Sequence, residues 1–131
     1  MSVLVTGAAG FIGYSITKAL LGKGRQVIGV DNLNDYYDVS LKQTRLSDLL
    51  QRTGFSFDQI DVADKDSINA LFRTNPDISE IIHLAAQPGV RYSLVNPYVY
   101  THSNIEGHLV LLEASRNLET LKHFIYASSS S

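Results

Sequence analysis

The residues that could carry out chemistry in this sequence gather first in a glycine-rich stretch, TGAAGFIG, at 6–13. Gly7, Gly10 and Gly13 follow a β-branched run at 2–6 and precede a segment with helical spacing of apolar residues. In that context the first glycine permits a tight turn, the second lets a diphosphate approach the backbone, and the third allows close packing of helix on strand. The free N–H groups of the helix would face the phosphates. The stretch therefore predicts dinucleotide binding, with an ordinary glycine turn as the alternative.

A carboxylate stands where such a site recognises the adenosine ribose. Asp31 follows a second apolar run at 26–30 and comes 18 residues after Gly13, close to the offset of about 20 residues expected for this contact. An acid there repels a 2′-phosphate, and no arginine follows it directly, so the sequence favours NAD over NADP. A strand-end acid that belongs to a plain turn is the alternative.

Alternating strand-like and helix-like segments would position these residues. Strands are predicted at 2–6, 26–30, 55–60, 80–86 and 123–128, and helices at 11–23, 41–53, 64–72 and 97–117. The expected inner faces are Ile12, Ile16, Ala19 and Leu20 in the first helix and Leu46, Leu49 and Leu50 in the second. Such a rhythm predicts an α/β fold with a doubly wound parallel sheet of the Rossmann type, in the strand order 3-2-1-4-5.

The alternation of strands and helices stops at a strand, since no helix follows the last one. We therefore expect 1–131 to be the N-terminal part of an NAD-binding Rossmann domain that is truncated on its C-terminal side, with the remaining strands and a substrate domain absent from this chain. The uncovered last strand is expected to leave a sheet edge and apolar surface exposed.

Composition narrows the class further. The chain has 131 residues, 44% hydrophobic and 18% charged, which is ordinary for a globular domain, and its net charge of −2 argues against nucleic acid or an anionic membrane as a partner. The absence of cysteine excludes disulfides and thiolate sites, and the four histidines are scattered, so no metal site is predicted. Without an apolar run of about 18 residues or a basic leader, the protein is expected to be cytoplasmic.

Four features together resemble the extended short-chain dehydrogenase/reductase family, the NAD-dependent epimerases and dehydratases of sugar nucleotides. They are VTGAAGFIG at 5–13, Asp31, HLAAQ at 83–87 and YASSSS at 126–131. The resemblance covers the whole chain. Two loops, DNLNDYYDVSLK at 31–42 and QPGVRYS at 87–93, are most similar to those of UDP-glucuronate 4-epimerases.

The resemblance implies NAD as the cofactor and assigns a role to each matching residue. The implied contacts are Gly7, Gly10, Phe11, Ile12 and Gly13 for the diphosphate, Asp31, Asn32 and Asn34 for the adenosine ribose, Asp61 and Val62 for adenine, and Leu84, Ala85, Ala86, Gln87 and Ser128 for the nicotinamide side. Asn104 would steady the loops near the cofactor. A helix N-cap is the alternative for Asp61, and a surface amide is the alternative for Asn104.

The resemblance also implies that the central catalytic pair is missing. In the family a tyrosine phenolate takes a proton from a sugar hydroxyl while the carbon beneath gives a hydride to the nicotinamide, and an epimerase returns the hydride to the other face. The Tyr-x-x-x-Lys pair would follow the last strand, so the chain alone is expected to be inactive. Tyr14 and Lys18 have the same spacing, but they lie on the first helix and are expected to be structural.

Substrate contacts are implied at the end of the last strand and in the loop after the fourth. By register with the family, Ser129 is the catalytic hydroxyl that would hydrogen-bond the reacting sugar oxygen, with Ser128 and Ser130 alongside. Arg91 suits a uronic acid or diphosphate through bidentate hydrogen bonds, with a surface salt bridge as the alternative. His83 is expected to be a packed, hydrogen-bonded histidine.

Three functions remain open from the sequence. The first is the cofactor half of a nucleotide-sugar epimerase that interconverts UDP-glucuronate and UDP-galacturonate. The second is a nucleotide-sugar dehydratase or reductase of the same family, and the third is a non-catalytic NAD(P)-sensing protein. The resemblance further implies a UDP-sugar as the small-molecule partner. It also implies a homodimer of the full-length protein through the long fourth helix and the helix that would follow the last strand.

Overall fold

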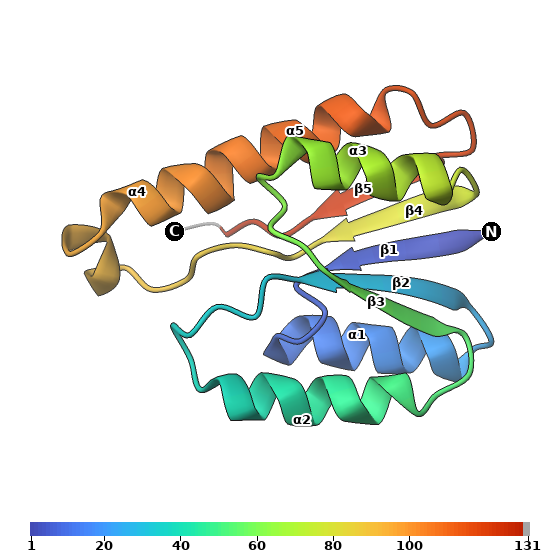
Figure 1. The fold of residues 1–131 in the computed structure, drawn as a ribbon, viewed down its shortest axis with the longest axis horizontal. Helices are drawn as coiled ribbons and strands as arrows, with labels where there is room; N and C mark the ends of the chain where they lie inside the picture. Colours follow the sequence, from blue (N-terminus) through green and yellow to red (C-terminus); the bar gives the residue numbers. More distant parts are fainter. Residues whose placement is uncertain (130–131) are drawn as a thin grey trace.

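The computed structural model describes residues 1–129, and a five-stranded parallel sheet runs through its centre (Figure 1). The strands are β1 (Ser2–Thr6), β2 (Gln26–Asp31), β3 (Phe55–Gln59), β4 (Ile78–His83) and β5 (His123–Tyr126). They lie in the order β3-β2-β1-β4-β5, and every neighbouring pair is parallel. The predicted fold class and strand order are confirmed.

Helices cover both faces of the sheet, which makes the fold doubly wound (Figure 1). On one face lie α1 (Phe11–Gly22) and α2 (Val39–Leu50), and on the other lie α3 (Lys65–Thr74) and the long helix that precedes β5. One buried cluster centres on Leu4, Ile68, Ile81 and Leu111, and a second centres on Val3, Val5 and Val27. Because β1 is buried on both faces, its sequence is a continuous apolar run rather than an alternating one.

The long helix is continuous but irregular. The single helix predicted over 97–117 consists of α4 (Pro97–Tyr100), a π-helical stretch η2 (Thr101–Glu106) and α5 (Gly107–Ser115). A short 3₁₀ helix, η1 (Arg91–Leu94), comes before it. In Figure 1 α4 extends past the carboxyl ends of the strands, so this half of the helix overhangs the region where Rossmann folds bind ligands.

The predicted inner faces of the first two helices are partly wrong. In α1 the buried residues are Gly13 and Thr17, whereas Ile12 is 58% exposed. In α2 the buried residues are Lys42 and Leu49, whereas Leu50 is 56% exposed. A prediction based on apolar side chains alone therefore misplaces part of the buried face of each helix. The inner face of α1 includes the small residues Gly13 and Thr17 beside the partly buried Leu20, as predicted for Leu20, and that of α2 includes a cation.

β5 forms one edge of the sheet, as predicted for the last strand. Ile125 and Tyr126 are 44% and 58% exposed on it. Within residues 1–129, no helix is both long enough and apolar enough to cross a lipid bilayer.

Candidate functional site

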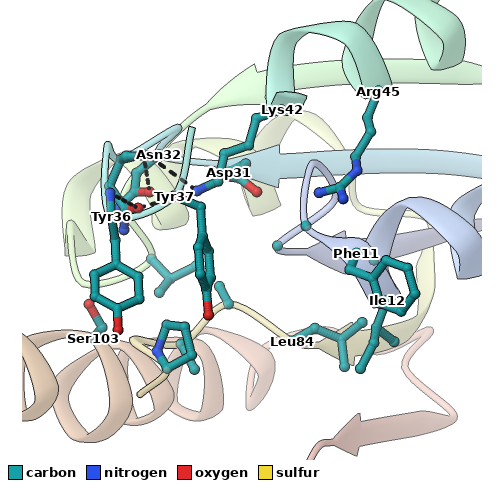
Figure 2. A pocket seen from close by; sticks show the side chains of 18 of the residues that line it. Phe11, Ile12, Asp31, Asn32, Tyr36, Tyr37, Lys42, Arg45, Leu84 and Ser103 are labelled. Carbon is teal, nitrogen blue, oxygen red and sulfur yellow. Dashed lines mark hydrogen bonds between the residues drawn. The ribbon is translucent and has the colours of Figure 1, made fainter. Parts of the chain in front are cut away.

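A cleft of about 740 Å³ lies beyond the carboxyl ends of the strands (Figure 2). The predicted cofactor residues that line it are Gly7, Gly10, Phe11, Ile12, Gly13, Asp31, Asn32, Asn34, Asp61, Val62, Leu84, Ala85 and Ala86. They come from the carboxyl ends of the strands, the loops that follow β1, β2, β3 and β4, and the first turn of α1. The cleft opens where the chain leaves β1 toward one face of the sheet and β4 toward the other, which is the switch point at which such sheets bind ligands.

The glycine turn brings the backbone itself to the wall of the cleft. Gly7 has a φ of +73°, a left-handed conformation that favours glycine, and its carbonyl oxygen accepts from the N–H of Gly10 at 3.0 Å. A Cβ on Gly13 would lie 2.0 Å from that same oxygen, so only glycine lets α1 approach the turn this closely. Gly10 caps α1 without a side-chain hydrogen bond. The start of the helix is therefore suited to receive an anion.

Asp31 ties the glycine turn to the loop after β2. Its side chain is buried, Oδ2 accepts from the N–H of Ala9 at 3.1 Å, and Oδ1 accepts from the N–H of Leu33 at 2.8 Å. Leu33 has a φ of +55°, uncommon for a residue other than glycine, which bends the loop back over the carboxylate. Because a carboxylate offers about four acceptor positions, Asp31 can still accept from the hydroxyl groups of a ligand.

Two cations on α2 also face the cleft, and the sequence prediction missed both of them (Figure 2). Lys42 is only 9% exposed, and Nζ donates to the main-chain carbonyl of Asn34 at 3.3 Å and to its side-chain oxygen at 3.2 Å. Both acceptors found for it within residues 1–129 are neutral. A buried ammonium without a carboxylate partner favours an anionic or hydroxyl-bearing ligand. Arg45 donates from Nη1 to the carbonyl of Ala9 at 3.1 Å, so it lies against the glycine turn.

Tyr36 and Tyr37 close the end of the cleft that is far from the glycine turn, and the sequence prediction missed these two residues. Tyr36 and Tyr37 line the cleft from the loop after β2, with their ring centroids 4.8 Å apart. Tyr36 packs on Tyr92 of η1 at 5.1 Å, and Figure 2 shows Tyr36 beside Ser103 of the long helix. Tyr100 donates to the carbonyl of Pro88 at 3.0 Å. The rings thus connect the loops after β2 and β4 across the cleft.

Asn104 holds the loop after β4. Its Oδ1 accepts from the N–H of Gln87 at 2.7 Å, and its Nδ2 donates to the carbonyl of the same residue at 3.2 Å. Asn104 is thus an exposed amide that also steadies the loop, as the resemblance implied. Gln87 itself is buried and is not among the residues that line the cleft. The predicted strand at 80–86 was too long, because β4 ends at His83 and the next three residues form the cleft wall instead.

His83 and Thr6 hold the start of the loop after β4 through hydrogen bonds. The hydroxyl oxygen of Thr6 accepts from the N–H groups of Leu84 and Ala85, each at 3.0 Å, and lies 2.6 Å from Nδ1 of His83. With its acceptor positions used, the hydroxyl donates to Nδ1, which must then be unprotonated. Burial, and to a lesser degree the nearby His108, lower the pKa of His83 to about 4. His83 is thus a packed, neutral histidine, as predicted.

This buried histidine predicts a pH dependence of stability. Between pH 6.5 and about 4 the unfolded chain takes up a proton on His83 that the native state does not. We therefore expect its contribution to the free energy of unfolding to be complete above pH 6.5 and to be lost progressively below it, by up to about 3 kcal/mol. Urea unfolding across this range measures the loss.

Two variants measured in the same urea series test whether His83 causes this pH dependence of the free energy of unfolding. His83→Gln should flatten the slope, whereas His123→Gln, at an exposed position on β5, should leave it unchanged. An unaltered slope in His83→Gln would contradict the assignment.

Asp61 is not the N-cap of α3, which was the alternative interpretation. Asp64 holds that position and accepts from the N–H of Ser67 at 3.3 Å. Asp61 instead accepts from the N–H of Ala63 at 3.0 Å through Oδ1. Asp61 and Val62 line the cleft, as does Ser103 of the long helix.

Of the predicted substrate residues, Arg91 and Ser129 are not among the residues that line the cleft. Arg91 is exposed on η1, and Ser128 and Ser129 are exposed in the extended segment after β5, where Ala127 does line the cleft. Ser130 is outside the described residues. The structure therefore brings most of the predicted cofactor residues together, but Gln87 and Ser128 do not line the cleft, and the roles of the serines and of Arg91 stay predictions.

Tyr14 and Lys18 are not a catalytic pair. The phenol of Tyr14 donates to Oδ2 of Asp48 on α2 at 2.6 Å, and this hydrogen bond raises the pKa of the phenol. Lys18 lies with Nζ 5.9 Å from the centroid of the tyrosine ring. Neither residue lines the cleft, and the hydrogen bond from Tyr14 joins α1 to α2.

Comparisons with known proteins agree with this geometry. A family model described as GDP-mannose 4,6 dehydratase matches residues 4–131. The chain is 50% identical over 128 residues to a UDP-glucuronate 4-epimerase of Thermodesulfobacterium geofontis, covering 98% of this chain and 39% of that protein. It is 47% identical to UDP-glucuronate 4-epimerase 2 of Arabidopsis thaliana, covering 100% of this chain and 30% of that protein.

A solved structure also matches the whole chain. It is the UDP-glucuronic acid 4-epimerase of Bacillus cereus in complex with UDP-glucuronic acid and NAD, with a TM-score of 0.89 and 37% identity. The match covers 100% of this chain and 41% of that one. The chain thus spans about two fifths or less of the length of these relatives.

Proposed function

Because the chain belongs to the GDP-mannose 4,6 dehydratase family, among the extended short-chain dehydrogenases/reductases, we propose that it is the NAD-binding part of a nucleotide-sugar epimerase. The observation that carries this proposal is the shared cleft. It joins a glycine turn at a helix start to a buried acid that can accept from ribose hydroxyls.

The residues of the cleft fit NAD by their chemistry. The close approach of α1 to the glycine turn, which Gly13 permits, and the start of α1, which has no side-chain cap, suit a diphosphate, and Arg45 adds a positive charge beside the turn. Asp31 and Lys42, with Asn32 and Asn34, suit the adenosine ribose. Asp61 and Val62 are proposed for adenine, and Leu84, Ala85, Ala86, Gln87 and Ser128 for the nicotinamide side. When bound, NAD supplies a carbon that takes up and returns a hydride.

We propose UDP-glucuronate as the substrate and UDP-galacturonate as the product. The names of the relatives support this choice, and so does their identity to this chain of 50% and 47%. In this reaction the hydroxyl of Ser129 would hold the reacting sugar oxygen, with Ser130 beside it, and Arg91 would pair with a carboxylate or diphosphate. A nucleotide-sugar dehydratase is the second candidate, supported by the description of the matching family model.

The proposal has a direct test in two parts. NAD should raise the melting temperature of the 131-residue chain, because a ligand that binds only the native state stabilises it. The full-length protein should convert UDP-glucuronate to UDP-galacturonate with catalytic NAD, as followed by chromatography of the products, and the 131-residue chain should not. A melting temperature that NAD leaves unchanged would exclude the cofactor site. A 4-keto-6-deoxy product would instead support the dehydratase.

We further propose that the whole protein forms a homodimer through the long helix. Ile105, Leu109 and Leu112 are 66%, 56% and 41% exposed, and their spacing places them along one outward stripe. An apolar stripe of this kind is typical of a helix that packs against another helix. Light scattering of the full-length protein and of Leu109→Glu measures this association.

A further inference from the structure

His102 lies on the π-helical stretch opposite the loop that follows β3. Its Nε2 is 2.7 Å from Oδ2 of Asp61, and its Nδ1 is 3.1 Å from Oε2 of Glu106. A neutral imidazole has only one N–H, so both contacts are hydrogen bonds only when the ring carries two protons. The geometry is therefore that of an imidazolium between two carboxylates.

The carboxylate that His102 contacts belongs to the cleft. Asp61 lines it together with Val62 and Ser103, and its second oxygen accepts from the N–H of Ala63 at 3.0 Å. Held at both oxygens, the carboxylate has a defined orientation. Each oxygen keeps one further acceptor position, so Asp61 can still accept from a donor such as the exocyclic amine of adenine.

We propose that His102 is a positioning residue for the dinucleotide: its imidazolium orients Asp61 as a hydrogen-bond acceptor at the adenine end of the cleft and compensates the acidic charge there. NAD then binds more tightly while His102 is protonated. This inference rests on the proposed NAD site.

The charges around the ring give the direction of the effect. The groups that act on it are Asp61, from the loop after β3, and Glu106, on its own helix, and the hydrogen bond to Asp61 is the largest cause of a pKa raised above 6.5. Partial burial opposes this shift. Once the ring loses its proton, two carboxylates remain uncompensated beside a ligand that carries an anionic diphosphate. Loss of orientation and charge repulsion both weaken binding, so affinity falls as pH rises through the pKa of His102.

The test is the dissociation constant of NAD, measured by calorimetry between about pH 5.5 and 8.5. We expect the wild-type affinity to fall by roughly fivefold over this range, as for a partly exposed charge pair. His102→Gln, which has no charge to lose, should bind weakly at every pH. His102→Arg should bind tightly at every pH, because guanidinium stays protonated. His123→Gln, a matched control at the amino end of β5, should keep the wild-type profile.

The outcomes separate this inference from the function on which it rests. If His102→Gln keeps the wild-type pH profile, or binds NAD as tightly as wild type at acidic pH, His102 has no positioning role although NAD still binds. If His102 had only a structural role, NAD binding by His102→Arg would still depend on pH as it does in the wild type. If the wild-type protein binds no NAD at any pH, the proposed function fails and this inference is overturned with it.

Discussion

Replacement of Asp31 by Ala is expected to remove most of the rise in melting temperature that NAD gives the wild-type protein. At an NAD concentration of about 100 times Kd the wild type gains about 2.7 kcal/mol, or about 10 °C for a domain of this size. Hydrogen bonds to a charged acceptor contribute roughly 1.5–3 kcal/mol, so their loss weakens binding by up to roughly a hundredfold. At the same NAD concentration about 0.4 kcal/mol would remain, a shift of only about 1–2 °C.

The comparison must separate binding from folding, since Asp31 also accepts from the N–H groups of Ala9 and Leu33. The quantity to measure is therefore the difference in melting temperature with and without NAD in each variant. Asp77→Ala is the matched control, because Asp77 accepts from the hydroxyl of Ser2 at the opposite end of β1. It should melt at a lower temperature yet keep the full NAD effect. A full NAD effect in Asp31→Ala would contradict the ribose assignment.

Gly13→Ala should abolish measurable NAD binding and destabilise the fold by about 2–3 kcal/mol. The added Cβ would lie 2.0 Å from the carbonyl oxygen of Gly7 and 2.8 Å from its carbonyl carbon. Both atoms are backbone, so α1 or the turn must move rather than a flexible side chain. Such a shift displaces the helix start from the position where it would face the diphosphate. Urea unfolding and calorimetry with NAD measure the two effects.

Gly22→Ala is the control on the same helix. No atom lies within 4 Å of a Cβ built there, and alanine is favoured over glycine in a helix by about 0.5–1 kcal/mol. This variant should therefore be as stable as the wild type or slightly more so, with unchanged NAD binding. Wild-type affinity in Gly13→Ala would show that the turn does not hold the diphosphate.

The features that sequence predicted well are those that local pattern determines. The glycine turn and Asp31 are recognisable because their spacing within one strand–helix–strand unit is nearly constant. The strand order follows from the alternation of strands and helices, since parallel strands require crossovers of one hand. The residues that depend on packing between distant segments were the ones missed.

Lys42 and Arg45 were missed although the spacing of residues in α2 places them on its buried face. Positions 42, 45, 46 and 49 have the i, i+3, i+4, i+7 spacing of one helix face, and Lys42 and Leu49 on it are buried. Counting only leucines shifted this face toward Leu50, which is exposed. Tyr36 had no comparable signal. Its place at the cleft depends on the left-handed Leu33 and on contact with Tyr92, which no local pattern encodes.

The π-helical stretch also sets the phase of the long helix. One additional residue in a turn rotates everything after it by about 100° relative to an uninterrupted α-helix. Asn104, within this stretch, holds the loop after β4 by a hydrogen bond, and Leu111, further along the helix, is buried in the core. Deletion of one residue between Thr101 and Glu106 is therefore expected to rotate the overhanging half of the helix relative to α5 and to change the contacts that it makes at the cleft.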